Sequence, residues 1–146
     1  MCVIWHIMMF ENLNLPRDDI LFEKTSLVVS YSNDILSFDR DVKDNIPNLI
    51  KTIGYGRSLN NFNSFKEAII IINDLYQDIS TIINNYDVNL KEIIVIILEG
   101  SHNWSIKEDR YKIGFKMLKK VINNDETDFD KLMHSRENTP GDPKKI

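Results

Sequence analysis

The chain has few of the residues that make covalent cross-links or soft-metal sites. Cys2 is the only cysteine among 146 residues, so an intramolecular disulfide is excluded and a reducing, cytoplasmic compartment is expected. The three histidines, His6, His102 and His134, are too scattered to predict a zinc site. Any metal chemistry must therefore come from oxygen-bearing side chains.

A strong excess of basic charge is also missing. Lysine and arginine number 18 against 22 aspartates and glutamates, which gives a formal net charge of −4. The densest basic run, Lys116, Lys119 and Lys120, is typical of a solvated helix face. No nucleic-acid partner is expected, because binding a phosphate backbone needs an extended track of positive charge.

The sequence contains no hydrophobic run long enough to span a bilayer. The apolar residues 1–10 are too short for this, and they lack the basic lead-in and small-residue cleavage site of a signal peptide. They predict a buried helix that is broken before Pro16. Because this helix has no N-cap, we expect it to continue a helix of a larger protein.

The remaining composition suits one globular domain, with 42% hydrophobic and 27% charged residues. Apolar residues recur every three or four positions over 28–42, which predicts an amphipathic helix there. The prolines and glycines of the next segment predict a short helix around 48–53 and then a loop.

Two further helices are predicted downstream. Ser64 and Glu67 form a capping box at the start of a long apolar stripe. The β-branched run 93–98 would suit a buried strand, but the capping pair Asn89 and Glu92 and the lack of a partner strand favour a helix. The predicted fold class is therefore all-α.

The most informative polar pattern lies inside the amphipathic helix predicted over 28–42. Asn33, Ser37 and Asp41 recur every four residues, so on a helix they drift by only about 40° per step and lie on one stripe. An amide carbonyl, a hydroxyl and a carboxylate are ligands that a hard divalent cation accepts. The stripe is a candidate Mg²⁺ site, although the spacing alone also fits an ordinary solvated face.

The nine residues 33–41, N-D-I-L-S-F-D-R-D, closely resemble the second metal-binding motif of class I terpene synthases, (N/D)Dxx(S/T)xx(K/R)(E/D). The resemblance implies that Asn33, Ser37 and Asp41 bind Mg²⁺, or Mn²⁺ in its place, and that Arg40 contributes to diphosphate binding. Asp41 stands where glutamate is usual, which keeps the carboxylate but shortens its reach by one methylene.

A second resemblance to the same family lies near residue 110. Trp104-Ser105 followed by Arg110-Tyr111 is similar to the family's late W-S-x-x-x-x-R-Y element, whose arginine and tyrosine reach the substrate diphosphate. Arg110 and Tyr111 are thereby implied as diphosphate-binding residues. Their chemistry is suitable, since a guanidinium donates two hydrogen bonds to phosphate and a phenol donates one. Taken alone, the pair also fits a surface arginine beside a packed tyrosine.

Asp18, Asp19 and Glu23 are similar to the family's aspartate-rich first motif, which holds the other magnesium ions. In the family that motif lies far upstream on a different helix, whereas here it closely precedes Asn33. We expect these residues to form the acidic first turn of the Asn33 helix, where they favour the positive end of the dipole. A metal role for them stays open.

The resemblance covers about residues 1–115 and implies a partial helical bundle, the C-terminal portion of a terpene synthase catalytic domain, over residues 1–122. The polar segment 123–146, with one amphipathic turn near Phe129, is expected to be a disordered tail. In the family, a carbon–oxygen lyase class, Mg²⁺ ions clamp an allylic prenyl diphosphate and promote its ionisation and cyclisation.

Several parts of the family's site have no counterpart in this sequence, namely the distant aspartate-rich helix, the upstream diphosphate-sensing arginine and most pocket walls. We therefore expect weak magnesium–diphosphate binding, little or no cyclisation by this chain alone, and a full-length synthase or a missing N-terminal half as its partner. A non-catalytic helical partner or scaffold derived from a terpene synthase is the alternative. The prenyl-elongating enzymes match less well, because they use two aspartate-rich motifs.

Overall fold

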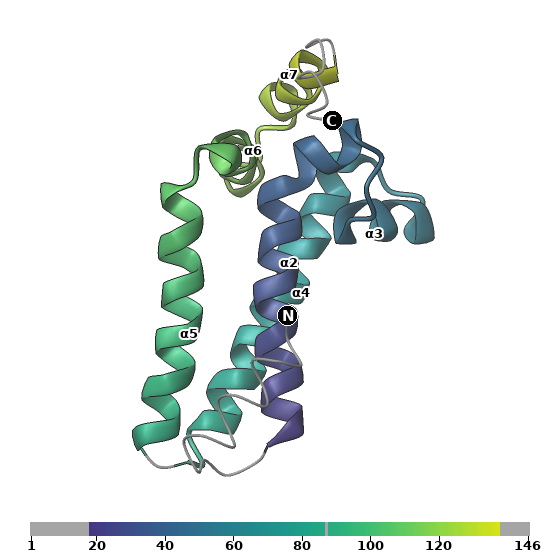
Figure 1. Ribbon diagram of the computed structural model, residues 1–146. Helices are drawn as coiled ribbons and strands as arrows, with labels where there is room; N and C mark the ends of the chain where they lie inside the picture. The colour runs from purple at the N-terminus through teal and green to yellow at the C-terminus, as the bar shows by residue number, and fades with distance from the viewer. Residues whose placement is uncertain (1–17, 87, 138–146) are drawn as a thin grey trace. The chain divides into compact units, whose positions relative to one another are not determined.

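The computed structural model describes residues 18–86 and 88–137 (Figure 1). Within these ranges the chain forms six α-helices and a 3₁₀ turn, and no strand. The elements are α2 (Asp19–Lys43), α3 (Leu49–Arg57), α4 (Asn61–Ile83), α5 (Val88–Lys107), η1 (Asp109–Tyr111), α6 (Lys112–Ile122) and α7 (Glu126–Glu137). The all-α prediction is confirmed for this part of the chain, including helix over 93–98. The helix expected over residues 1–10 and the break at Pro16 lie outside it.

Among the helices described, none combines the length and the apolar character needed to cross a bilayer. The described residues divide into two compact units. The first unit comprises residues 18–32 and Ile70–Lys107, and the second comprises Asn33–Ile69 and residues 108–137. Helices α2 and α4 are each divided between the two units.

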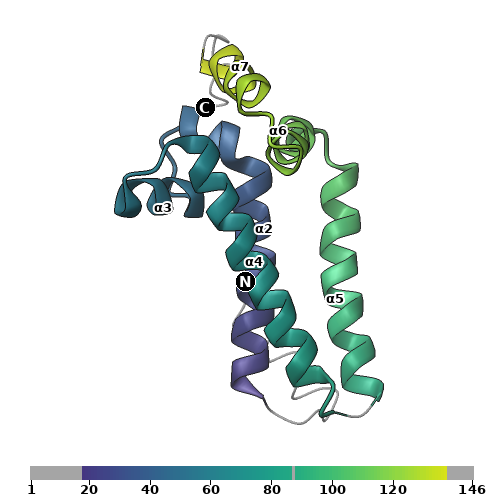
Figure 2. The ribbon, with the colours of Figure 1, turned by 180° about the vertical axis from the view of Figure 1, so that it is seen from behind.

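The first unit is held by a small apolar core. Its segments of α2, α4 and α5 run alongside one another in both ribbon views (Figures 1 and 2). The buried residues of this core are Leu21, Val28, Ile79, Leu90 and Ile94. At the edge of the core, Lys24 forms an ion pair with Asp78 at 2.6 Å.

Helix α2 begins where the acidic residues predict a helix start. The Asp18 carboxylate accepts a hydrogen bond from the Leu21 amide at 2.8 Å and another from the Tyr86 hydroxyl. The Tyr86 hydrogen bond, followed by that of Leu21, lowers the pKa of Asp18. Asp19 lies in the first turn, so these two residues serve the start of the helix.

The starts of α4 and α5 correct two capping predictions. Helix α4 begins at Asn61, ahead of Ser64, because Asn60 Oδ1 accepts a hydrogen bond from the Asn63 amide at 2.8 Å. The Ser64 hydroxyl donates instead to the carbonyl of Asn60 at 2.7 Å, so the predicted capping box is wrong. Helix α5 begins at Val88, which places the predicted capping pair inside the helix.

The second unit is organised around four phenylalanines. Phe65 on α4 makes edge contacts with Phe38 on α2 and Phe129 on α7, with centroids 5.8 and 5.6 Å apart. Phe62 contacts Phe129 in the same manner at 5.4 Å. All four rings are buried, and edge-to-face packing suits their quadrupoles. This phenylalanine cluster joins α2, α4 and α7.

Helix α7 corrects the expected disordered tail over Glu126–Glu137. Phe129 and Met133, one turn apart, are 0% and 5% exposed, and the Asp125 carboxylate accepts the Asp128 amide at 3.1 Å. Two buried side chains and one cap thus fix a segment whose composition is mostly polar. The expectation for residues 138–146 lies outside the described part of the chain.

An ion-pair network links α6 to α7 and provides a first prediction. Lys120 donates to Asp128 at 2.8 Å and to Asp125 at 3.1 Å, while Lys131 donates to Asp128 at 2.9 Å. These contacts, the Lys120 hydrogen bond first, lower the pKa of Asp128 to about 2. The network therefore stabilises the folded chain above the ordinary value of 3.8, and this contribution is lost as pH falls toward 2.

We expect a carboxyl-carbon NMR titration of Asp128 to show a midpoint near 2 in the wild-type chain. In a Lys120→Met variant the midpoint should rise toward 3.8, because the leading cause of the lowered pKa is removed. A wild-type midpoint near 3.8 would show that the ion pairs do not hold in solution, and a midpoint near 2 that stays in place after this substitution would show that Lys120 is not the leading cause.

Candidate metal and diphosphate site

Asn33, Ser37 and Asp41 lie along α2 in the second unit. The Ser37 hydroxyl donates to Asp41 Oδ2 at 2.6 Å, so these two side chains share one face of the helix, as the spacing predicts. Ser37 and Asp41 are 2% and 9% exposed, whereas Asn33 is an exposed residue. The stripe therefore runs from solvent toward the interior.

Asp41 has a second partner that the sequence analysis did not assign. Asn48 Nδ2 donates to the same Asp41 Oδ2 at 2.8 Å and to the carbonyl of Asp34 at 2.7 Å. Asn48 is also the N-cap of α3, because its Oδ1 accepts the Ile50 amide at 2.9 Å. Asp41 therefore fixes the start of α3 against α2.

Asp34 supports the same junction from the neighbouring position on α2. Its Oδ2 accepts the backbone amide of Leu49, the first residue of α3, at 2.8 Å. Burial raises the pKa of Asp34, the Leu49 hydrogen bond opposes that rise, and the nearby Asp41 charge adds to it. Asp34 and Asp41 thus both accept hydrogen bonds from groups at the start of α3, the Leu49 amide and the Asn48 side chain.

The turn η1 brings Tyr111 to the exposed end of the stripe. Tyr111 is 1% exposed, and its hydroxyl donates to Asn33 Oδ1. The guanidinium carbons of Arg110 and Arg40 lie 4.7 and 5.6 Å from the centre of the Tyr111 ring, within cation–π range. Tyr111 therefore contacts one of the implied metal ligands across 78 positions of sequence, and the two arginines implied as diphosphate ligands pack on its ring.

The donor set fits a hard divalent cation. Asn33 Oδ1 and Ser37 Oγ each keep a lone pair after the hydrogen bonds described above, and Asp41 Oδ1 takes part in none of the hydrogen bonds among the described residues. Within the described ranges no group of three or more histidine, cysteine, aspartate or glutamate side chains is placed to hold a metal. A cation here would depend on the amide and hydroxyl oxygens as much as on the carboxylate.

The arginines supply the complementary positive charge. Arg110 is an exposed residue, and Arg40 is partly buried. The Arg40 Nε atom is buried, and it makes no hydrogen bond with the described part of the chain. A buried N–H group without an acceptor costs about 1–3 kcal/mol, so binding an anionic oxygen next to Arg40 Nε would be favourable. Two guanidiniums on one tyrosine ring can together bind a polyphosphate.

Trp104 and Ser105, the other half of the late sequence element, belong to α5 of the first unit. Trp104 is 50% exposed, and the Ser105 hydroxyl donates to the Ser101 carbonyl at 2.9 Å. The hydrogen bond of Ser105 is therefore local to its own helix.

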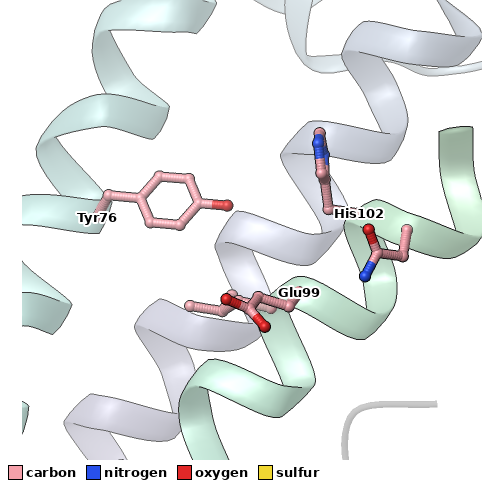
Figure 3. A pocket seen from close by; sticks show the side chains of 5 residues that line it. Tyr76, Glu99 and His102 are labelled. Atoms are coloured by element: carbon pink, nitrogen blue, oxygen red, sulfur yellow. The ribbon is translucent and has the colours of Figure 1, made fainter.

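A shallow groove of about 570 Å³ lies in the first unit, between α4 and α5 (Figure 3). Its lining residues are Tyr76, Leu98, Glu99, His102 and Asn103. Burial raises the pKa of Tyr76. The groove contains none of the residues implied by the resemblance, and no sequence pattern predicted it.

Comparisons with family models, curated proteins and solved structures find no match to this chain. The resemblance to class I terpene synthases therefore depends on the two sequence elements alone. Function has to be argued from the chemistry of the stripe on α2 and of the residues that reach it.

Proposed function

We propose that this chain binds Mg²⁺ together with the diphosphate of a prenyl diphosphate, in the manner of the class I terpene synthases that it resembles. One observation carries the proposal. The Tyr111 hydroxyl, far along the chain, donates to Asn33 while Arg40 and Arg110 pack on the same ring. The resemblance names these residues for one metal–diphosphate site, and their meeting in the fold supports that assignment.

The roles follow from the chemistry of each group. Asn33, Ser37 and Asp41 would hold the cation, with water or phosphate oxygens completing an octahedron. The guanidiniums of Arg40 and Arg110 would bind the diphosphate. Mg²⁺ would supply charge stabilisation of the diphosphate as a leaving group. The proposal is limited to binding, because one ligand triad provides one cation site and the resembling family uses a cluster of ions.

A non-catalytic helical scaffold is the second candidate, and the hydrogen bonds of Asp41 favour it. Its carboxylate accepts Ser37 and Asn48 at 2.6 and 2.8 Å and joins α3 to α2 without any ligand. If Asp41 has only a structural role, these two hydrogen bonds are sufficient for it and no cation is needed. The two candidates differ in whether ligands change the stability of the chain.

The test is a thermal melt of the whole chain with and without Mg²⁺ and pyrophosphate. Ligands held only by the folded state add about 2.7 kcal/mol at a hundredfold excess over the dissociation constant, so the wild-type melting temperature should rise. The rise should disappear in Asn33→Ala/Asp41→Ala, which removes two of the three cation ligands. Arg110→Ala should keep the response to Mg²⁺ and lose the additional response to pyrophosphate.

Asp130→Ala is the matched control, because it removes an exposed carboxylate from α7 of the same unit and should leave the full rise in place. If the wild-type chain melts at the same temperature with and without both ligands, the binding proposal fails and the scaffold is favoured. A rise that persists in the double variant would place the ligands elsewhere on the molecule.

A further inference from the structure

We infer that Asn48 is a positioning residue that limits Asp41 to one metal-binding oxygen and thereby favours Mg²⁺ over Ca²⁺. The inference rests on the proposed function, because it concerns the cation held by Asp41. It assigns a role in metal selectivity to a residue outside both sequence elements.

The first step concerns the two oxygens of Asp41. Each carboxylate oxygen has two lone pairs. On Oδ2 both are used, since Ser37 Oγ donates at 2.6 Å and Asn48 Nδ2 donates at 2.8 Å. Oδ1 receives no hydrogen bond from the described residues. A cation can therefore be bound through Oδ1 alone.

The second step concerns the orientation of the Asn48 amide. Its Oδ1 accepts the Ile50 backbone amide at 2.9 Å, and a backbone N–H can only donate. The Asn48 nitrogen must therefore be the atom that faces Asp41, and it divides its two protons between Asp41 Oδ2 and the Asp34 carbonyl. With Asn48 only 3% exposed, water has little access to replace these bonds.

The third step relates this arrangement to the cation. Ca²⁺ takes six to eight oxygens at about 2.3–2.6 Å and commonly uses both oxygens of a carboxylate, whereas Mg²⁺ needs a near-ideal octahedron at about 2.0–2.1 Å. A carboxylate restricted to one oxygen suits the octahedron and removes a ligand from the larger ion. Ser37 alone would leave one lone pair of Asp41 Oδ2 available to a cation. The hydrogen bond from Asn48 occupies that lone pair, so it is Asn48 that restricts Asp41 to one metal-binding oxygen.

The experiment measures how Mg²⁺ and Ca²⁺ displace Mn²⁺, followed by its EPR signal, from the whole chain without diphosphate. Asn48→Ser keeps an oxygen that can cap α3 but removes the amide donor to Asp41. We expect this variant to bind Mg²⁺ about tenfold more weakly, which is the usual effect of losing an outer-shell partner, while the preference for Mg²⁺ over Ca²⁺ also falls.

Thr52→Val is the matched control. The Thr52 hydroxyl donates to the Asn48 carbonyl at 3.1 Å, so its loss loosens the same helix start without altering Asp41. This variant should keep the wild-type Mg²⁺/Ca²⁺ ratio. If Asn48→Ser does not fold by circular dichroism, Asn48→Thr serves the same purpose, because a β-branched residue suits the extended backbone at position 48.

The outcomes separate this inference from the binding proposal. A Mg²⁺/Ca²⁺ ratio that falls with loss of the amide and is kept in the control supports the role of Asn48. Equal weakening of both ions, or no change, overturns that role while the cation site itself stands. A wild-type chain that binds no Mn²⁺ overturns both.

Discussion

A Gly114→Ala variant is expected to lose on the order of 3 kcal/mol of folding free energy, although it adds only one methyl group. A Cβ at position 114 would lie 2.6 Å from the carbonyl carbon of Leu36 and 2.7 Å from its Cα. Both are backbone atoms of α2, so no side-chain rotation can relieve the overlap. Helices α6 and α2 would have to move apart, and contacts around the buried Gly114 would be lost.

Urea unfolding followed by circular dichroism measures this loss as a lower midpoint. Gly100→Ala is the matched control, because Gly100 lies within α5 and a Cβ there meets no atom within 4 Å. This control should be stabilised by about 0.5–1 kcal/mol, the ordinary gain from replacing glycine in a helix. Equal midpoints for the two variants would mean that α6 does not approach α2 as closely as described.

The close approach at Gly114 also explains how the candidate site is assembled. Gly114 lies three residues after Tyr111, and Leu36 directly precedes Ser37. Where the α6 backbone touches that of α2, the preceding turn is held near the stripe, and the Tyr111 hydroxyl can reach Asn33. The Gly114→Ala variant should therefore also weaken any response to Mg²⁺ and pyrophosphate.

Local patterns predicted much of this fold because helices depend on residues close in sequence. The stripe of Asn33, Ser37 and Asp41 lies on a helix as its spacing requires, and the acidic residues at 18 and 19 begin that helix. The start of α3 was also close to its predicted position, with Asn48 as its cap. These features need no knowledge of tertiary contacts.

Features that depend on distant contacts could not be predicted in the same way. Asn48 reads in sequence as a helix start, and nothing local indicates that its amide also reaches Asp41. The segment 126–137 is mostly polar, so its composition did not predict that Phe129 packs on α4. The family resemblance implied a metal role for Asn33 and a diphosphate role for Tyr111, but it did not predict the hydrogen bond between them, and no spacing rule joins residues so far apart in sequence.

The candidate site is built on a part of α2 that the phenylalanine cluster holds in place. Phe38 follows Ser37 directly and packs against Phe65. A Phe65→Ala variant is expected to lose about 3–5 kcal/mol, the usual cost of removing a buried aromatic ring. Phe65 is 0% exposed and contacts rings from two other helices, so closing the cavity requires α2 or α7 to move.

Tyr55→Ala provides the comparison for Phe65→Ala, because Tyr55 is 95% exposed in the same unit and its loss should change the urea midpoint by no more than about 0.5 kcal/mol. Phe65→Leu should fall between the two, since it keeps most of the buried volume while removing the ring edges. If Phe65→Ala costs as little as Tyr55→Ala, the cluster does not join α2, α4 and α7, and the packing that supports Ser37 and Asp41 must come from another part of the unit.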